Sequence, residues 1–348
     1  MATKTALVTG GSGYIGLHVV NVLLEAGWTV HTTVRKLSNE AKVRPVQQLS
    51  EKHPGKLKLF EADLVVPGSF SEAMVGCSVV LHVASPFIVQ GVKDPQKQLI
   101  EPAIEGTRNV LESVNKTEAV KRLVLTSSIG TIYGDCADVL KMENQTLTER
   151  YWNETSSIKE SAYQYSKTLA EREAWKIAEA QSRWDLVVLN PGGVLGPSLS
   201  PASDSGSLSL FGQLLKGNMI IGVPDLSLPL VDVRDVAIAH LKASEKAEAK
   251  GRYIICSSEP ISFLDVSLRL KKVHSNPGRL PSWKIPRLIF RLLGPLSGIS
   301  QRWISANIGI EVKVDNSKSV KGLGMEYRPL DETLADYYRA WESEQKSA

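Results

Sequence analysis

The fold is decided near the start of the chain, where residues 5–16 read TALVTGGSGYIG. The first five residues predict a short strand, and a helical pattern of apolar residues starts at position 14. A pyrophosphate needs such a junction, because it must approach the free N–H groups at the start of the helix. Side chains at Gly10 and Gly13 would block that approach, and one at Gly16 would push the helix away from the strand. The residues expected to contact a dinucleotide here are Gly10, Gly13, Tyr14, Ile15 and Gly16.

Strand and helix patterns then alternate as far as residue 190. The strands are apolar on both faces, which is typical of a parallel sheet covered by helices on both sides. We therefore expect an α/β fold, a Rossmann-type doubly wound parallel sheet with a smaller C-terminal α/β substrate-binding domain. The predicted strands are 5–9, 29–34, 57–61, 79–83, 122–126 and 186–190, and the predicted helices are 14–26, 41–52, 69–75, 96–115 and 162–181.

After residue 190 the strand and helix patterns no longer alternate regularly. Residues 198–209 are rich in Ser, Pro and Gly and predict a loop, and the proline-rich residues 277–295 are expected in the smaller domain. Later elements are predicted as helices at 210–216 and 231–246 and a strand at 252–256. The expected division is an NADP-binding domain of residues 1–190 with 229–258, and a substrate-binding region of residues 191–228 with 259–348.

The composition argues against several classes of protein. With 43% hydrophobic and 22% charged residues, the 348-residue chain is of the ordinary globular kind. Its net charge is +4 and no run of Lys and Arg exceeds two residues, so no nucleic-acid partner is expected. Three cysteines without a CxxC spacing, and scattered histidines, predict reduced thiols and no metal site.

No targeting segment is visible, so a cytoplasmic location is expected. Residues 285–299 form the most apolar late stretch, but prolines and arginines interrupt it and it is too short to cross a bilayer. We expect this stretch to be an amphipathic segment that covers the smaller domain, with no membrane contact. The sequence leaves open whether the protein is a monomer or a homodimer.

The end of the second strand bears on which dinucleotide binds. A Rossmann unit that prefers NAD usually places an acid there, which binds the ribose 2′-hydroxyl. Here the strand ends in Arg35 and Lys36, with no acid. A guanidinium can hold a 2′-phosphate through two hydrogen bonds, so we expect NADP bound by Arg35, helped by Lys36 or Lys42. Asp63 either accepts a hydrogen bond from the adenine amine, with Leu64 beside it, or caps a turn.

Tyr163 and Lys167 stand four residues apart in a predicted helix, so they share one face. Carbonyl reduction needs a hydride and a proton for the new alkoxide, but a free tyrosine, with a pKa of about 10, is a weak acid. A lysine cation beside the phenol is expected to lower that pKa. Tyr165 lies two residues from Lys167 and faces away from it. Ser128, at the carboxyl end of the fifth strand, is expected to polarise the carbonyl, with Ser127 as the alternative.

Five segments, taken in order, resemble the extended short-chain dehydrogenase/reductases. They are TGGSGYIG at 9–16, HVASP at 82–86, LTSS at 125–128, YQYSKTLAE at 163–171 and NPG at 190–192. The chain is most similar to the group of dihydroflavonol reductases, cinnamoyl-CoA reductases and fungal-type methylglyoxal or aldehyde reductases. It departs from the cinnamoyl-CoA reductases in the residues around the tyrosine, and from the flavonoid reductases in carrying a tyrosine, Tyr133, in the region after the serines.

This resemblance implies a role for each matched residue. Tyr163 would donate the proton, Lys167 would activate it and bind the nicotinamide ribose, and Ser128 would hold the carbonyl. The cofactor would be NADPH, with its 2′-phosphate on Arg35. Further cofactor contacts would come from Val83, Ala84, Ser85, Thr126, Pro191, Gly192 and Val194.

The expected activity is reduction of an aldehyde or ketone to an alcohol by NADPH. The segments expected to line the substrate, residues 85–87, 128–133 and 193–211, contain no Lys or Arg, which favours a medium-sized apolar or aromatic substrate. Two adjacent glycines, Gly192 and Gly193, predict a roomy pocket wall. Substrate contacts are expected from Ser85, Pro86, Phe87, Ser128, Ile129, Tyr133 and Gly193, and from residues up to Phe211.

Three other functions remain compatible with the fold. A sugar-nucleotide epimerase or dehydratase would keep NAD bound, and Arg35 argues against it. A hydroxysteroid-type dehydrogenase would use the same residues in the oxidative direction. A non-catalytic NADP sensor would bind a protein partner, but such a protein has no need of Tyr163 and Lys167.

Overall fold

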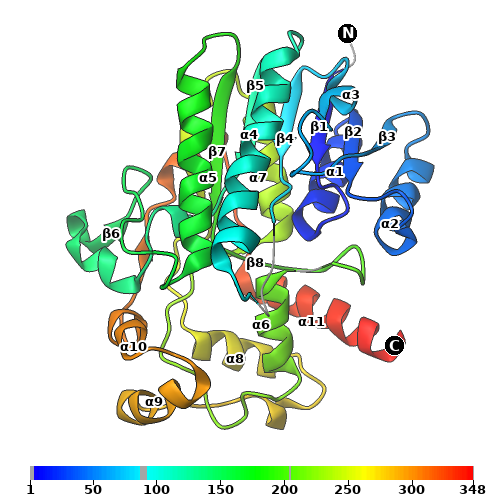
Figure 1. Cartoon of the computed structure of the whole chain (residues 1–348). Helices are drawn as coiled ribbons and strands as arrows, with labels where there is room; N and C mark the ends of the chain where they lie inside the picture. Colours follow the sequence, from blue (N-terminus) through cyan, green and yellow to red (C-terminus); the bar gives the residue numbers. More distant parts are fainter. Residues whose placement is uncertain (1–3, 87–91, 204, 348) are drawn as a thin grey trace.

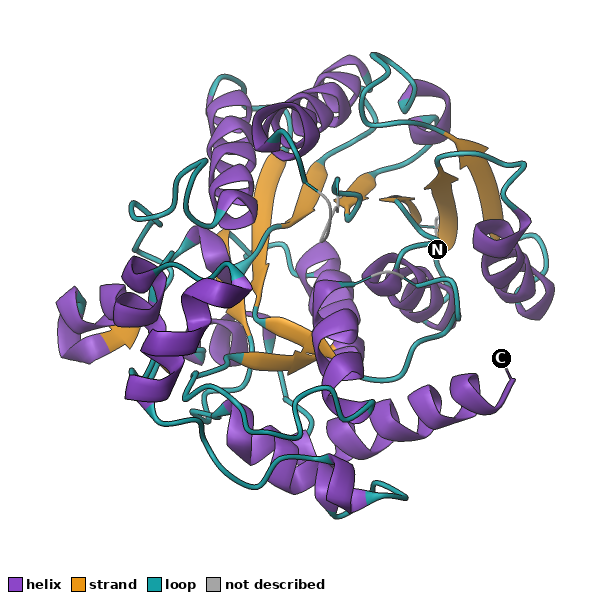
Figure 2. Cartoon of the chain, turned by 60° about the horizontal axis from the view of Figure 1, so that its bottom comes forward, coloured by secondary structure: helices purple, strands orange, loops and turns teal. Residues whose placement is uncertain are grey.

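The computed structural model describes residues 4–86, 92–203 and 205–347. Its centre is a seven-stranded sheet in the order β10-β7-β5-β4-β1-β2-β3, in which all neighbours are parallel. Figures 1 and 2 show helices on both faces, so the predicted Rossmann-type doubly wound sheet is confirmed. The strands are β1 Thr5–Thr9, β2 Thr29–Val34, β3 Leu57–Glu61, β4 Val79–His82, β5 Arg122–Thr126, β7 Asp185–Pro191 and β10 Gly251–Ile255.

The strand order places a ligand crevice beside β1. From β1, the chain adds β2 and β3 on one side and β4, β5, β7 and β10 on the other. At such a switch point the carboxyl ends of the strands leave a crevice. Helices α1 and α7 pack together on one face of the sheet, and α4 and α5 on the other. The helices beside the sheet are α1 Tyr14–Glu25, α2 Glu40–Lys52, α3 Ser71–Met74, α4 Glu101–Lys116, α5 Ala162–Glu179 and α7 Val233–Glu245.

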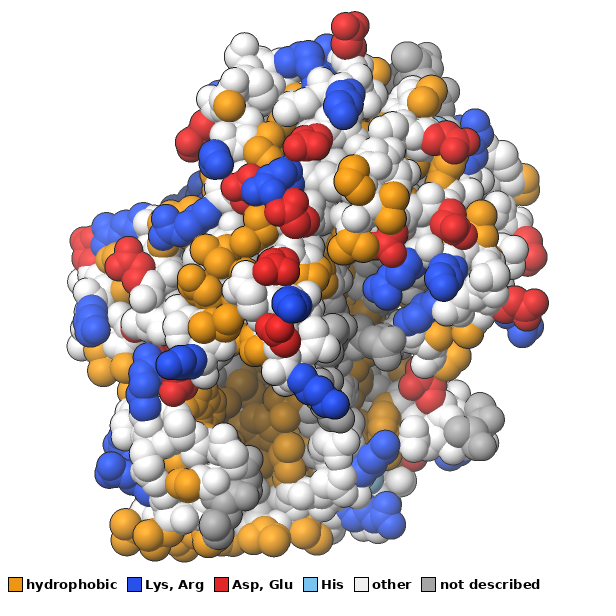
Figure 3. All heavy atoms as spheres, in the orientation of Figure 1, with side chains coloured by type: hydrophobic (Ala, Val, Ile, Leu, Met, Phe, Trp, Pro, Cys, Tyr) orange, Lys and Arg blue, Asp and Glu red, His pale blue; other side chains and the backbone are white. Residues whose placement is uncertain are grey.

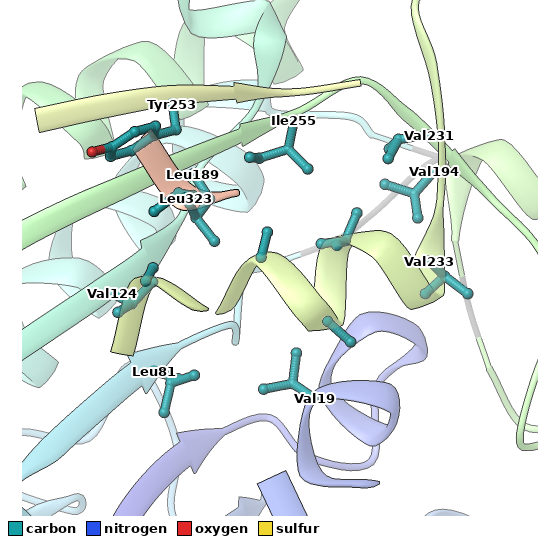
Figure 4. Packing of buried hydrophobic residues seen from close by; sticks show 14 of the residues in the cluster. Val19, Leu81, Val124, Leu189, Val194, Val231, Val233, Tyr253, Ile255 and Leu323 are labelled. Carbon is teal, nitrogen blue, oxygen red and sulfur yellow. The ribbon is translucent and has the colours of Figure 1, made fainter. Parts of the chain in front are cut away.

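Both faces of the sheet are buried by apolar side chains. Figure 4 shows Val19 of α1 on the side of Leu81 of β4, and Val233 at the start of α7 on the side of Val194 and Val231, all within one apolar cluster. A second cluster joins the opposite face to α4 and α3. This burial on both sides explains why the strands are apolar throughout.

Most predicted bounds agree with the structure to within two residues, and the exceptions have local causes. The predicted helix at 96–115 starts as a π-helix, η1 Gln96–Ile100, before α4 begins. Pro102 lies at this junction, where it cannot donate the backbone hydrogen bond of a continuous helix. The predicted loop at 198–209 ends early, because α6 spans Gly206–Leu215.

A smaller region with its own core lies beside the sheet. The rings of Phe211 and Phe263 stack there with centroids 5.5 Å apart, and Leu334 and Tyr337 of the last helix pack in the same cluster. This region therefore has an apolar centre of its own, distinct from the two clusters on the main sheet. Its elements are α6, β8 Gly193–Leu195, β9 Leu230–Asp232, α8 Phe263–Lys271, α9 Arg287–Leu293, α10 Gln301–Asn307 and α11 Leu330–Ser347.

The segment around residues 312–325 departs from the expected division. Val314 and Leu323 belong to the core of the main sheet, although the sequence assigned them to the smaller region. Figure 4 shows Leu323 beside Tyr253 of β10, and β11 Lys313–Val314 pairs with β6 Thr146–Leu147. Because β10 is an edge strand, this returning segment covers a part of the sheet that would otherwise be open.

The apolar stretch at 285–299 does not form the buried cover that was expected. All of α9 is described, and it contains no buried residue, with Leu288 and Leu292 71% and 69% exposed. Gly294 and Pro295 follow the helix directly, so it is limited to seven residues. Among the described residues, no helix has the length and apolar character needed to cross a membrane.

Candidate active site

The turn between β1 and α1 is held by contacts that only glycine allows. Gly10 has a φ of +70°, in the left-handed region that favours glycine. A Cβ on Gly16 would lie 2.2 Å from the carbonyl oxygen of Gly10, which supports the packing role predicted for Gly16. A Cβ on Gly11 would lie 1.9 Å from Oγ1 of Thr32 on β2. The sequence did not reveal this role of Gly11, because it depends on which residue of the neighbouring strand faces the turn.

The start of α1 fits a bound pyrophosphate. Gly13 stands at the cap position, and no side chain in the described chain caps this helix. The N–H groups of Tyr14 and Ile15 therefore have no side-chain partner and lie at the positive end of the helix. A Cβ on Gly13 would meet only the Gly10 carbonyl, at 3.2 Å, so the turn leaves room for a phosphate. The Tyr14 hydroxyl points elsewhere and donates to the Gly196 carbonyl at 3.0 Å.

Exposed cations stand at the carboxyl end of β2. Arg35 and Lys36 directly follow this strand, and both side chains are exposed. The next residue, Leu37, donates its backbone N–H to the carboxylate of Glu61 at the end of β3, at 2.8 Å. That bond fixes the course of the chain just after the two cations. This arrangement suits a 2′-phosphate, which a guanidinium binds well.

The other residues expected near the adenosine have partners within the protein. Asp63 accepts a hydrogen bond from a backbone N–H two residues further on, at 3.1 Å, which is the turn-capping role that the sequence left open. Leu64 packs against α4, where a Cβ on Gly106 would lie 2.9 Å from it. Lys42 donates to the backbone carbonyl of Ala202 and so ties α2 to the loop before α6.

The Thr9 hydroxyl joins the ends of β1 and β4. It accepts hydrogen bonds from the N–H groups of Val83 and Ala84, at 3.1 and 3.0 Å, and lies 2.9 Å from Nδ1 of His82. Burial, together with the nearby Lys167 cation, lowers the pKa of His82 to about 3, so its ring is neutral. These contacts hold the backbone after β4 at the crevice, where the ribose contacts were predicted.

The two serines that follow β5 have different partners. Ser127 donates its hydroxyl hydrogen bond to the buried carboxylate of Glu171. Ser128 accepts a hydrogen bond from the N–H of Gly130 at 3.1 Å and is only half-buried. The Ser127 hydroxyl is thus engaged inside the protein, which supports Ser128 as the serine that reaches a substrate.

Tyr163 lies in the first turn of α5, and its side chain is 37% exposed. Desolvation of its hydroxyl end raises the pKa of Tyr163 to about 12. The sequence predicted a lowered pKa, so this expectation is wrong for the protein alone. Because burial disfavours the phenolate, Tyr163 is protonated near neutral pH, which is the form that can donate a proton. The helix is preceded by Ser161, a residue in the left-handed region with a φ of +59°.

Lys167 lies one turn further along α5. Burial lowers the pKa of its ammonium to about 8, while the Glu171 carboxylate, four residues on, acts in the opposite direction. The lysine is therefore mostly cationic at neutral pH. A cation at this point can bind ribose hydroxyls and stabilise charge near the tyrosine.

Glu171 holds together a set of buried polar groups that the sequence analysis did not connect with one another. Its carboxylate accepts hydrogen bonds from the hydroxyls of Ser127 and Thr131, the amide of Asn190 and Nε of Arg252. The distances from Thr131, Asn190 and Arg252 are 2.7, 2.8 and 2.6 Å. We call these five residues the Glu171 network.

Arg252, which lies on the edge strand β10, completes this network. It donates to the backbone carbonyls of Glu149 and Tyr151, at 2.9 and 2.5 Å, and its guanidinium lies 4.0 Å from the centroid of the Trp152 ring. A buried ion pair is tolerated when its remaining donors are satisfied in this way. The network therefore fixes the chain around Ser128. The only sequence signal was an acid at residue 171, one turn after Lys167 on the active helix.

Several predicted contacts have side chains that turn away from the crevice. The Thr126 hydroxyl lies 2.7 Å from Nε2 of His240 on α7, so only the backbone of Thr126 is available to a cofactor. Ile129 and Tyr133 are only 7% and 8% exposed and belong to the main core. Little surface of either side chain is therefore available to contact a substrate. Val194 is buried in the same core. Phe87 lies outside the described residues.

The glycines after β7 do not create extra space in the pocket wall. A Cβ on Gly192 would lie 2.5 Å from the Pro229 carbonyl oxygen, and one on Gly193 would lie 3.0 Å from Leu230. The expectation of a roomy wall here is therefore wrong, because the segment before β9 fills the space. Pro191, the last residue of β7, is buried.

The crevice opens toward the smaller region. Figure 3 shows a hollow lined by hydrophobic side chains, between the helices of the main sheet and those of the smaller region. Within the described chain, no group of three or more His, Cys, Asp or Glu side chains is arranged to hold a metal. The three cysteines are free and buried. The site therefore offers an apolar chamber, a phenol, an ammonium and a hydroxyl.

Comparison with known proteins places this geometry in a family. The NAD dependent epimerase/dehydratase family matches residues 6–256. Tetraketide alpha-pyrone reductase 2 of Arabidopsis thaliana is 40% identical over 274 residues, which is 78% of this chain and 83% of that protein. Cinnamoyl-CoA reductase CAD2 of Medicago truncatula is 33% identical over 331 residues, covering 94% and 93% of the two chains.

The fold of one solved structure matches that of this protein over nearly the whole chain. Yeast methylglyoxal/isovaleraldehyde reductase Gre2, complexed with NADPH, superposes with a TM-score of 0.79 at 27% identity, covering 99% of this chain and 100% of that one. The family match extends from β1 through β10 and so includes every strand of the main sheet. The chain therefore belongs to the NAD dependent epimerase/dehydratase family, within the extended short-chain dehydrogenase/reductases.

Proposed function

We propose that this protein is an NADPH-dependent reductase that converts an aldehyde or ketone to an alcohol. The observation that carries the proposal is the packing of the short helical turn after Ser128 against α5, the helix that bears Tyr163 and Lys167, at the carboxyl edge of the sheet. Relatives with 40% and 33% identity are named reductases, and the yeast structure is described as complexed with NADPH. The exposed Arg35, with no acid at the end of β2, favours NADPH over NADH.

Each group has a distinct task in the proposed reaction. NADPH, when bound, supplies the hydride that adds to the carbonyl carbon. Ser128 donates a hydrogen bond to the carbonyl oxygen, and Tyr163 transfers its phenolic proton to that oxygen as negative charge develops on it. Lys167 holds the cofactor ribose and stabilises the phenolate that remains. Solvent then returns a proton to Tyr163, so the overall change consumes one carbonyl, one NADPH and one proton.

We propose a medium-sized apolar or aromatic carbonyl compound as substrate. The hollow in Figure 3 has mainly hydrophobic side chains on its walls. Ile129 and Tyr133 contribute little to this surface, so the smaller region must supply most of the substrate contacts. Phe211 is buried in that region's core, so we do not expect it to contact the substrate directly.

The direct test is the loss of NADPH absorbance with a panel of aldehydes, α-diketones, aryl ketones and a flavanonol, repeated with NADH. We expect turnover with NADPH on at least one apolar carbonyl. The Tyr163→Phe variant should lose about 10²–10⁴-fold in kcat while its NADPH affinity stays unchanged. Tyr165→Phe, in the same helix, is the matched control and should keep full activity. Tightly bound NAD with no turnover would instead favour an epimerase or dehydratase.

A further inference from the structure

Helix α9 and a neighbouring turn present apolar side chains to solvent. Backbone hydrogen bonds hold the two segments together, because the N–H of Val223 donates to the Trp283 carbonyl and the N–H of Ile285 donates to Val223, at 3.3 and 2.8 Å. Figure 3 shows hydrophobic side chains along the lower edge of the molecule, where Figure 1 draws α9. We call the exposed residues Ile220, Ile221, Trp283, Leu288, Leu292 and Leu293 the apolar rim.

The rim lies in the most basic part of the chain. Residues 266–310 contain eight Lys and Arg and no Asp or Glu. The whole chain has a net charge of +4, so the rest of the protein is net negative. An apolar surface bordered by cations, with no acid in its own segment, is the pattern of a helix that lies on an anionic lipid surface.

Part of this positive charge is not neutralised. Acids from elsewhere pair with Arg269, Lys284 and Arg302, at 2.7, 2.6 and 2.8 Å. Arg287 and Arg291 stand one turn apart on α9 and form no ion pair with any described residue. In the same described part of the chain, the remaining unpaired cations of this segment are Lys271, Lys272 and Arg279.

We propose that the apolar rim docks the protein onto an anionic membrane surface. Leu288, Leu292 and Trp283 would enter the boundary between headgroups and acyl chains, and Arg287 and Arg291 would meet the lipid phosphates and carboxylates. The docking is peripheral and reversible, because α9 has only seven residues. This inference rests on the rim and its charge and does not depend on the proposed reaction.

Charge also argues against a second copy of this chain as the occupant. A twofold dimer through the rim would bring the same surface of both subunits together. Arg287 and Arg291 of one protomer would then face the same basic segment of its partner, with no acid from residues 266–310 to offset them. Like charges brought together in this way weaken an interface, whereas anionic lipids complement them.

The test is co-sedimentation of the full chain with vesicles of phosphatidylcholine, and with vesicles that also contain phosphatidylserine. We expect binding to the anionic vesicles that weakens as salt is raised, with much less binding to the neutral ones. Leu288→Asp with Leu292→Asp, and separately Arg287→Gln with Arg291→Gln, should each reduce vesicle binding by about tenfold or more. Val75→Asp changes an equally exposed apolar residue beside the main sheet and should bind as the parent protein does.

Two results would overturn the proposal. One is the absence of binding to anionic vesicles, or binding that the α9 variants do not reduce. The other is a dimer, measured by light scattering, that the Leu288→Asp and Leu292→Asp changes dissociate. Turnover of a water-soluble aldehyde and thermal unfolding should match the parent in every variant, which separates failure of docking from loss of fold or activity.

Discussion

The half of the sheet that carries the glycine turn and the half that carries Ser128 hold their local structure in place by different means. Around β1 and β2 the structure depends on residues without side chains, because Gly11 and Gly16 allow close contacts that any side chain would prevent. Around β5, β7 and β10 a buried carboxylate, Glu171, gathers donors from distant parts of the chain. The first half is thus sensitive to added volume and the second to lost charge. This difference can be tested in each half separately.

The largest effect should come from removing the charge at the centre of the Glu171 network. Glu171→Gln leaves Arg252 buried without its carboxylate, which should lower the free energy of unfolding by about 3–5 kcal/mol. Urea unfolding measures this change. Glu143→Gln removes an exposed partner of Arg150 and should cost less than about 1 kcal/mol. Equal losses in the two variants would show that the network contributes no more than a surface pair.

The stability of the protein should fall when a larger side chain replaces a glycine of the turn between β1 and α1. Gly11→Ala places a methyl group against Thr32 and should destabilise the protein by about 1–3 kcal/mol, by the usual cost of overpacking. Adding Thr32→Ala removes the obstructing atoms, so the double variant should be more stable than the sum of the single changes predicts. Gly278→Ala is the control, because the nearest atom to its Cβ would be 3.6 Å away. Strict additivity of the two changes would contradict the proposed contact.

The cofactor preference should depend on Arg35. Arg35→Ser should raise the KM for NADPH by about tenfold, because a charge-assisted hydrogen bond to the 2′-phosphate is lost. The KM for NADH should change little, since that cofactor lacks the phosphate. Lys52→Ser, at the far end of α2, is the matched control for general loss of positive charge. If Arg35→Ser raises the KM for NADPH and the KM for NADH by the same factor, the role assigned to Arg35 is wrong.

The smallest expected effect is on the pH dependence of kcat/KM. Lys167 has a pKa lowered to about 8, so kcat/KM should fall to about half near that pH, as the ammonium loses its proton. Glu171 raises the pKa of Lys167, so in Glu171→Gln the fall should move to lower pH. Initial rates measured across pH 6 to about 10 test both statements. A parent profile that stays flat through this range would contradict a titrating Lys167.

The same contrast explains which parts of the site the sequence could predict. The glycine turn and the pair of Tyr163 and Lys167 are local patterns, so their spacing, their place relative to the predicted strands and helices, and the family resemblance together indicated their roles. The link between Glu171 and Arg252 joins residues 81 positions apart, and no local pattern connects them. For the same reason the sequence could not show that Ser127 and Thr126 have inward partners. It could not show that α9 stays exposed either, because apolar spacing does not reveal whether another element covers a helix.

The Glu171 network also has a consequence for the order in which the protein can mature. Glu171 is translated well before Arg252, and the intervening residues take on the order of ten seconds to synthesise. Until β10 has been made and has joined the edge of the sheet, the carboxylate lacks its cation and the chain around Ser128 lacks its support. Helix α1, which follows the glycine turn, likewise lacks its packing partner until α7 has been made, shortly before β10. The chain around Ser128 therefore cannot reach its final support until the last strand of the main sheet has been synthesised.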